Sequence, residues 1–369
     1  MPLKIKTITC HEVYNYGASL QEYALLIYLE ELGHQAMTIH YKPDYLSQHF
    51  NLWRISSPKW NKNIILRFIY LTIKLPARIK ILKRKRSFDK FSEKYIKRTQ
   101  KLYRTNDDLK NDIPEADAYI CGSDQIWNSF FQNGKDPAFY LNFAPDNKLK
   151  ISYAASFAID QIAEELKSFV KKSVERIDHI SVRETSGVTI LNDLGVENVL
   201  QVMDPVFLLK KEAWNEFELP MIDENFIFIY DFDSNILVKK MAMKMKEKYN
   251  AKIYTVNSNI NYADRNFNLE GPETYLSLVK NAKFIVTNSF HAVAFSLIFE
   301  KQFVVFNRVE KINTRMRDLL QSISLRNLLL LSEESVTTFN YTIDYTQTNI
   351  QLNKLVEKSK HFLNQALEE

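Results

Sequence analysis

Short apolar runs alternate with segments of helical periodicity along most of the chain. Apolar runs bounded by polar turns are typical of buried strands, whereas apolar residues that recur about every 3.6 positions are typical of helices. In the first half this pattern predicts strands at residues 4–9, 35–41, 118–121, 150–155, 179–182 and 199–202, and helices at residues 18–32, 161–176 and 186–194. Strands that alternate with helices form parallel sheets, so this half predicts an α/β domain.

The second half repeats the pattern, with predicted strands at residues 226–230, 252–256, 284–286 and 303–306, and helices at residues 237–249, 273–282, 292–299, 312–322 and 352–367. The two blocks separate near residues 205–222. We therefore predict two Rossmann-like domains that face a cleft, over residues 1–205 and 206–330, followed by a C-terminal helical extension over residues 331–369.

The composition, 46% hydrophobic and 25% charged, is that of a folded globular protein. Cys10 and Cys121 form no CxxC pair and no HExxH or Asp-rich loop occurs, so we expect neither a disulfide framework nor a metal site. The N-terminus has no apolar signal core, and no uncharged apolar run approaches the roughly 18 residues that span a bilayer. These features predict a cytoplasmic location.

Residues 51–104 differ in charge from the rest of the chain. They contain 17 Lys and Arg but only two acids, Asp89 and Glu93, so this segment carries +15 and the remainder −10. One interpretation is a basic helical insertion that faces water. The alternative is a surface that meets anionic lipid head groups or an anionic acceptor, which would make the protein peripheral at the inner membrane surface. Nucleic acid is not expected, because no base-stacking or recognition-helix motif accompanies the charge.

Candidate chemistry is concentrated at Asn288-Ser289-Phe290-His291, between a predicted strand and a predicted helix. Ligands bind at the carboxyl edge of open α/β sheets, and the unpaired N–H groups of a helix start favour an anion. Lys311 and Arg315 follow the next strand at i, i+4 spacing and can share a helix face. A lone histidine near a helix start is often structural and a basic pair is often solvated, so both interpretations stay open here.

Three turns in the first half also follow predicted strands. Asn15, Gly17 and Gln21 lie at the first strand-to-helix turn, where capping is the alternative to ligand binding. The segment from Gly122 to Asn128 contains Asp124 and Trp127, which form either a ligand wall or an ordinary turn with a core tryptophan. Arg183 could hold a phosphate or carboxylate, or else pair with Glu184 or Asp204.

Taken in order, these segments resemble the polysaccharide pyruvyl transferase family. The motifs are Asn15-Tyr16-Gly17-Ala18 with Leu20-Gln21, Gly122-Ser123-Asp124-Gln125-Ile126-Trp127-Asn128, Ser152-Tyr153-Ala154-Ala155-Ser156-Phe157, Ser181-Val182-Arg183-Glu184, Asp204-Pro205-Val206-Phe207-Leu208-Leu209 and Asn288-Ser289-Phe290-His291. They cover about residues 10–320. The chain departs from the family at Ala158 and Ala292, where glycine is frequent, and the basic insertion is not part of the signature.

The resemblance implies a fold like the GT-B glycosyltransferase architecture, phosphoenolpyruvate as donor and a saccharide as acceptor, with no cofactor. Such enzymes form a pyruvate ketal across two sugar hydroxyls in bacterial exopolysaccharide or capsule biosynthesis and release phosphate. By the same resemblance His291 matches the family's essential histidine, and Arg183 and Lys311 match groups that hold the donor's anions.

The chemistry of these side chains is compatible with that reaction. An imidazole can donate and accept protons near neutral pH, so we predict His291 as the general acid. The predicted donor site comprises Arg183, Asn288, Ser289, Lys311 and Arg315. The predicted acceptor or cleft residues are Asn15, Gly17, Gln21, Asp124, Trp127 and Ser156. No metal is required.

Two other functions remain open from the sequence. A nucleotide-sugar-dependent glycosyltransferase on the same architecture would also place donor phosphates near a helix start in the second domain. A non-catalytic sugar-binding member of a membrane-surface biosynthetic complex would use residues 51–104 but turn over no donor. Neither the identity of the acceptor sugar nor whether the acceptor is lipid-linked is encoded in any motif.

Overall fold

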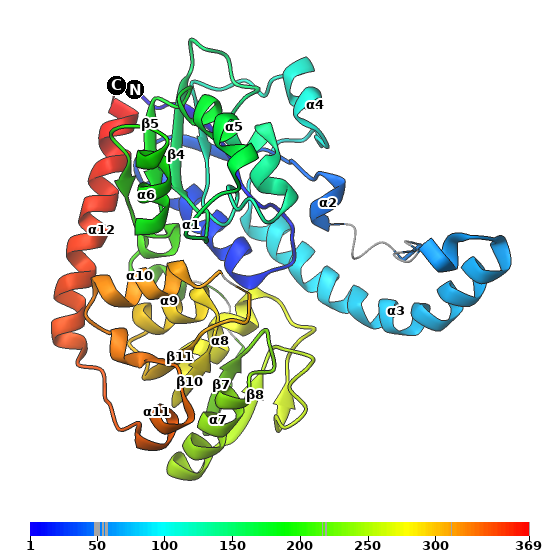
Figure 1. Ribbon diagram of the computed structural model, residues 1–369, viewed down its shortest axis with the longest axis vertical. Helices are drawn as coiled ribbons and strands as arrows, with labels where there is room; N and C mark the ends of the chain where they lie inside the picture. The colour runs from blue at the N-terminus through cyan, green and yellow to red at the C-terminus, as the bar shows by residue number, and fades with distance from the viewer. Residues whose placement is uncertain are drawn as a thin grey trace.

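The computed structural model describes residues 1–47, 52–53, 55, 58–215, 217, 220–310 and 312–368. It contains two parallel six-stranded sheets, one above the other in Figure 1, each flanked by helices. Strands such as FIFIY of β7 are buried along their whole length, as expected for parallel strands whose two faces are both covered by helices. The predicted α/β fold class is confirmed.

The first sheet has the strand order β2-β1-β3-β4-β5-β6. Its strands are β1 (Lys4–Ile8), β2 (Gln35–Thr38), β3 (Ala118–Cys121), β4 (Leu149–Ala155), β5 (His179–Val182) and β6 (Leu200–Gln201). The helices of this half are α1 (Tyr16–Glu31), α2 (Asp44–Ser47), α3 (Ile64–Tyr95), α4 (Asn106–Asn111), α5 (Glu164–Val174) and α6 (Thr185–Asp193).

The second sheet has the order β12-β11-β10-β7-β8-β9. Its strands are β7 (Phe226–Tyr230), β8 (Lys252–Thr255), β9 (Arg265–Asn266), β10 (Phe284–Thr287), β11 (Phe303–Phe306) and β12 (Leu329–Leu330). Its helices are α7 (Ile236–Tyr249), α8 (Pro272–Asn281), α9 (Phe290–Ile298), α10 (Thr314–Ser322) and α11 (Glu333–Thr338), and α12 (Tyr345–Glu368) ends the chain. The two-residue strands β9 and β12 were not predicted, because they are too short to show a period.

Each sheet has one point where the strand order reverses. In the first sheet the chain leaves β1 for β2 on one side and returns to β3 on the other. In the second sheet it leaves β7 for β8 and returns to β10. Ligands of open α/β sheets bind at the carboxyl ends of the strands that flank such a point. The segments after β1, β3, β7 and β10 are therefore the ones that topology assigns to a ligand site.

Two helices connect the domains. The C-terminal helix α12 runs beside both (Figure 1): near its start the Tyr345 hydroxyl donates to Ser296 O at 3.2 Å, and near its end the Ser359 hydroxyl accepts from Met203 N at 2.8 Å. Helix α3 belongs to the basic segment and projects from the body of the molecule.

In the part of the chain that the structure describes, no helix has the length and apolar character needed to cross a membrane.

Candidate active site

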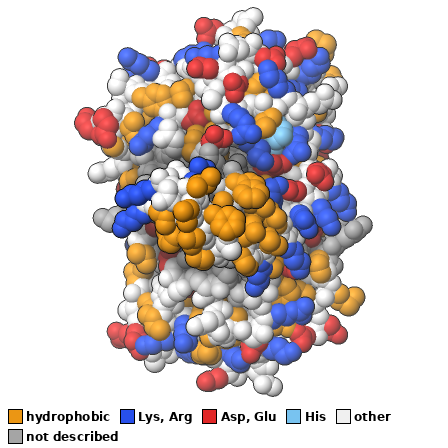
Figure 2. All heavy atoms as spheres, turned by 90° about the vertical axis from the view of Figure 1, so that its right-hand side faces the viewer, with side chains coloured by type: hydrophobic (Ala, Val, Ile, Leu, Met, Phe, Trp, Pro, Cys, Tyr) orange, Lys and Arg blue, Asp and Glu red, His pale blue; other side chains and the backbone are white. Residues whose placement is uncertain are grey.

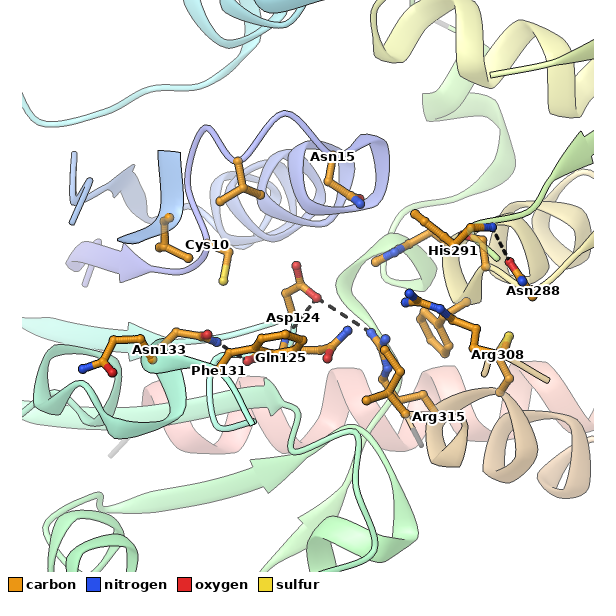
Figure 3. Close-up of a pocket in the computed structure, with 18 of the residues that line it drawn as sticks. Cys10, Asn15, Asp124, Gln125, Phe131, Asn133, Asn288, His291, Arg308 and Arg315 are labelled. Atoms are coloured by element: carbon orange, nitrogen blue, oxygen red, sulfur yellow. Dashed lines mark hydrogen bonds and ion pairs between the residues drawn. The ribbon is translucent and has the colours of Figure 1, made fainter. Parts of the chain in front are cut away.

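A cleft of about 430 Å³ lies where the carboxyl edges of the two sheets meet (Figure 3). Its first-domain wall includes Asn15, which follows β1, and Asp124, which follows β3. Its second-domain wall includes Phe232, which follows β7, and His291, which follows β10. The cleft is thus built from the segments at both topological switch points.

His291 lies in the first turn of α9, directly after β10. Ser289 is the N-cap of this helix, and its hydroxyl accepts a hydrogen bond from Ala292 N at 3.5 Å. The cap fixes where the helix begins and therefore sets the direction of the imidazole, which lines the cleft and is only 7% exposed. The unpaired N–H groups of the first turn lie beside it, so this corner favours a negatively charged ligand.

The imidazole of His291 is held between two residues from distant parts of the chain. A Cβ added at Gly17 would lie 1.9 Å from Nδ1 of His291, so the ring packs directly on the glycine at the start of α1. Nε2 lies 3.4 Å from Oδ2 of Asp204. The first turn of α1 therefore contacts the first turn of α9 across the cleft, and only glycine leaves room for this contact.

Asp204 is fully buried and connects His291 to Arg183. It forms a close ion pair with the Arg183 guanidinium, and its other carboxylate oxygen accepts from Val206 N at 3.1 Å. Burial by itself would raise the pKa of Asp204, but the charges of His291 and Arg183 hold this pKa well below its usual range. Asp204 is therefore an anion that contacts both Arg183 and His291, and the Arg183–Asp204 pair that was predicted as an alternative is present.

Arg315 on α10 lines the cleft, whereas Arg183, whose side chain is 1% exposed, lies next to it but is not a lining residue. The two guanidinium groups pack at 4.7 and 5.5 Å from the ring centre of Phe290, and each lies near Oδ1 of Asp124, at 3.7 Å for Arg183 and 3.8 Å for Arg315. Figure 3 shows Asp124 and Arg315 facing each other. Burial, and next the positive charge of Arg183, lower the pKa of Arg315 to about 10.

The arginines of the cleft keep hydrogen-bonding capacity unused. Within the described residues, Nε and Nη2 of Arg183 and Nε of Arg315 are buried and have no hydrogen-bond partner. Buried donors in folded proteins are normally paired, and guanidinium groups match the oxygens of phosphates and carboxylates. These nitrogens therefore give the cleft the properties of an anion-binding site.

Arg308 is a second arginine of the cleft lining and was not predicted from the sequence. It follows β11, its guanidinium stacks 4.5 Å from the ring centre of Phe232, and its Nη2 donates to Glu310 at 2.8 Å. Its Nε is buried without a hydrogen-bond partner in the described structure. Its position two residues after a predicted strand could have indicated that Arg308 lies at the cleft.

Several predicted site residues line the cleft but are already engaged in the fold. Asn288 donates to Asp231 at 2.7 Å and accepts from Phe232 N at 3.0 Å, so it ties the end of β10 to the segment after β7. Asn15 caps α1 by accepting from Gly17 N at 3.0 Å. Asp124 has a positive φ of 70°, a conformation that stores strain in a residue other than glycine.

Gly17 and Arg183 contact cleft residues but do not line the cleft themselves, and three further predicted residues lie away from it. Gln21 is buried and bonds Thr9 and Ser123, which fixes the turn after β3. Trp127 is buried in the core, where it stacks on Tyr140. Ser156 is buried and donates to Glu184 at 3.0 Å. Lys311 lies outside the described residues.

The sequence model of the polysaccharide pyruvyl transferases matches residues 15–308, about four fifths of the chain, and this span includes the cleft residues from Asn15 to Arg308. The chain belongs to the polysaccharide pyruvyl transferase family. The family's description implies a transferase. No curated protein matches the chain.

Solved structures of similar fold include nucleotide-sugar enzymes. A candidate UDP-N-acetylglucosamine 2-epimerase from Listeria monocytogenes is 9% identical with a TM-score of 0.50, and the match covers 97% of this chain and 91% of that one. The UDP-N-acetylglucosamine 2-epimerase of Rickettsia bellii is 12% identical with a TM-score of 0.49 over 99% and 97% of the two chains. An alpha-glucosyltransferase solved with UDP and a 13-mer DNA is 9% identical with a TM-score of 0.47 over 100% and 94%. At these identities the likeness concerns the fold alone, which is GT-B-like.

One departure from the family signature has a structural consequence. Ala158 has a φ of 58°, in the left-handed region that glycine adopts without strain. Its backbone N–H donates to the Glu184 carboxylate at 2.9 Å, next to the N–H of Phe157 at 2.8 Å. These hydrogen bonds hold Ala158 in a conformation for which this pyruvyl transferase family often uses glycine.

A separate buried cluster surrounds His11, behind the first-domain wall. His11 Nδ1 lies 2.7 Å from Glu22 and its Nε2 lies 3.4 Å from Glu12. With His40, His11 and Glu12 form a group of potential metal ligands, but Lys42 and Arg98 also pair closely with Glu12. Two cations on the shared carboxylate disfavour a metal ion there.

The charge of His11 predicts a pH dependence of stability. Burial would lower the pKa of His11, but the carboxylates of Glu22 and Glu12 outweigh burial and raise the pKa to about 9. Because the folded pKa exceeds the unfolded value of about 6.5, the protonated ring stabilises the fold fully below pH ~6.5. This contribution, roughly 1.4 kcal/mol per unit of pKa shift, is lost as the pH rises through about 9.

Urea unfolding of the wild type and of His11→Gln at pH 6, 7.5 and 9 tests this expectation. The difference in unfolding free energy between the two proteins should shrink as the pH rises. A difference that stays constant from pH 6 to 9 would contradict a protonated, stabilising His11.

Proposed function

We propose that this protein transfers pyruvate from phosphoenolpyruvate to a saccharide as a ketal, with phosphate as the leaving group, in the synthesis of a cell-surface polysaccharide. The observation that carries the proposal is the convergence of Arg308, Arg315 and His291 at one cleft between the domains, with Arg183 buried beside them against Phe290. Family membership supports the class of donor and acceptor.

The donor carries a phosphate and a carboxylate, so it needs several cations in a fixed arrangement. Arg183 and Arg315 share the Phe290 ring, and Arg308 lies on the Phe232 ring, so all three guanidinium groups are oriented by stacking before a ligand binds. An anion between them would offset the mutual repulsion that contributes to the lowered pKa of Arg315. The first turn of α9 adds backbone N–H groups to this arrangement.

His291 is proposed as the proton donor. Protonation of the methylene carbon of phosphoenolpyruvate makes C2 electrophilic, and a sugar hydroxyl then adds to C2 and loses its proton. A second hydroxyl replaces phosphate at C2, so the net products are a ketal and inorganic phosphate. Asp204 orients the imidazole through the ion-pair contact with Nε2, and Asp124 and Asn15 face the cleft from the acceptor side.

The arginines provide the binding test. Arg308→Gln and Arg315→Gln are each expected to raise the Kd for phosphoenolpyruvate roughly 10- to 100-fold, because each removes a charged hydrogen-bond donor from a desolvated site. Isothermal titration calorimetry measures this change. Arg326→Gln serves as the matched control, since it removes the same charge from an exposed site in the second domain.

Three results would contradict the proposal. An unchanged Kd in both cleft variants would remove the arginines from the donor site. Tight binding of a UDP-sugar with none of phosphoenolpyruvate would favour a nucleotide-sugar glycosyltransferase. Binding without turnover of either donor would favour a non-catalytic sugar-binding protein.

A further inference from the structure

The outer half of α3, together with the short helix η2 (Pro58–Asn61), forms an arm that projects from the first domain (Figure 1). We define the arm as residues 58–82. Its large apolar side chains include Ile64, Ile65, Phe68 and Ile73, which are 81%, 67%, 72% and 63% exposed. Figure 2 faces the side from which the arm projects and shows hydrophobic side chains gathered in one patch beside Lys and Arg.

The spacing of these residues explains why they remain exposed. Positions 64, 65, 68 and 73 fall within one half of a helical wheel, and Ile69 and Ile79, also exposed, fall in the same half. The other side of α3 contacts η2, where the rings of Trp60 and Tyr70 lie 5.8 Å apart. The arm therefore uses one face for its own packing and leaves an apolar face to solvent. Exposed apolar patches of this kind mark interaction sites.

The charge around the apolar face indicates which kind of partner binds to it. Residues 45–88 contain 11 Lys and Arg and no acidic residue. A second copy of the arm would bring like charges together, whereas an anionic lipid surface would accept both the apolar face and the cations. A basic helix with a wide apolar face is the arrangement that binds in the plane of a membrane interface.

We propose that the arm docks on a membrane surface that contains anionic lipids. In this position Ile64, Ile65, Phe68 and Ile73 enter the head-group region and Lys80, at the edge of the apolar face, contacts lipid phosphates. Arg67 and Lys74 lie on the opposite half of the helical wheel and add to the positive charge that attracts the anionic surface.

The arm joins the body of the molecule near the cleft at its C-terminal end. Before it, Tyr45 and Leu46 of α2 line the cleft. After it, Arg84 donates to the Tyr16 hydroxyl at 2.7 Å and to Asn268 O of the second domain at 2.7 Å. A membrane-bound arm therefore brings the cleft close to the lipid surface, and this step rests on the proposed function: the acceptor would be a lipid-linked saccharide.

Co-sedimentation of the full chain with vesicles tests the docking. Binding is expected to vesicles of phosphatidylcholine with 30% phosphatidylglycerol, to fall in 0.5 M salt, and to be at least about 10-fold weaker on phosphatidylcholine alone. The apolar variant Ile64→Gln/Ile65→Gln/Phe68→Gln should weaken binding at least about 10-fold. The charge variant Arg67→Gln/Lys74→Gln/Lys80→Gln should weaken it roughly 10-fold.

Control variants make changes of the same kind away from the arm, two for the apolar variant and three for the charge variant. Met221→Gln/Leu331→Gln removes exposed apolar groups from the second domain, and Lys110→Gln/Lys354→Gln/Lys358→Gln removes three exposed cations. Both controls should bind vesicles like the wild type. Circular dichroism and turnover with a water-soluble acceptor should be unchanged in the arm variants.

The proposal is overturned if the wild type binds neither vesicle, or if the arm variants bind like the controls. It is also overturned if the apolar variant converts a dimer to a monomer in solution while vesicle binding stays the same, because a second copy would then cover the face. Vesicle binding is measured without any donor. Vesicle binding without ketal formation would therefore contradict only the proposed function. Ketal formation without vesicle binding would contradict only the proposal that the arm docks on a membrane.

Discussion

His291→Gln is expected to reduce pyruvyl transfer by roughly 10²- to 10⁴-fold while the protein remains folded. Glutamine keeps much of the size of the ring but cannot deliver a proton near neutral pH. The arginines that would bind the donor are unchanged, so the Kd for phosphoenolpyruvate should change little. Phosphate release measures turnover, and calorimetry measures the Kd.

The same substitution at a histidine outside the cleft distinguishes the loss of His291 from the loss of any histidine. His361 lies exposed on α12, far in sequence from the cleft segments, and His361→Gln should leave turnover unchanged. If His291→Gln kept near-normal turnover with a normal circular dichroism spectrum, His291 would not be the proton donor.

Gly17→Ala should have an effect of similar size, although Gly17 has no side chain. The added Cβ would lie 1.9 Å from Nδ1 of His291, a distance that atoms do not adopt, so the imidazole must move. A displacement of about 1 Å at a reacting group can cost roughly 100-fold in rate. We expect kcat to fall by about that factor or more, with a smaller change in donor Kd.

A double variant tests whether Gly17 acts through the histidine. In a His291→Ala background the clash is absent, so Gly17→Ala should cause little further loss, and the two effects should be far from additive. Full additivity, or a Gly17→Ala enzyme with normal kcat, would show that the contact between α1 and α9 does not position the ring.

The sequence was sufficient to predict where several residues in and next to the cleft lie, because they follow strands. In a parallel sheet the carboxyl ends of strands meet at one edge, so Asp124, Arg183 and His291 could be assigned to that edge without coordinates. Arg315 was predicted from its spacing alone and does lie in the cleft. The helical character of the basic segment was also expected.

Contacts between the domains could not be predicted, because they join residues far apart in the chain. Nothing local indicates that the His291 ring packs on Gly17, or that Asp204 serves Arg183 and His291 at once. Trp127 was predicted as part of a cleft wall, but its indole is buried in the core. There its N–H donates to Phe139 O at 3.0 Å, which satisfies the polar atom of the ring.

Product analysis in D₂O tests the central claim most directly. With phosphoenolpyruvate and a saccharide acceptor, the protein should release one phosphate for each pyruvate ketal formed. The ketal methyl group should carry one deuterium, because the methylene carbon gains one proton from an exchangeable site. Glycosyl transfer from a UDP-sugar with no ketal from phosphoenolpyruvate would contradict the account.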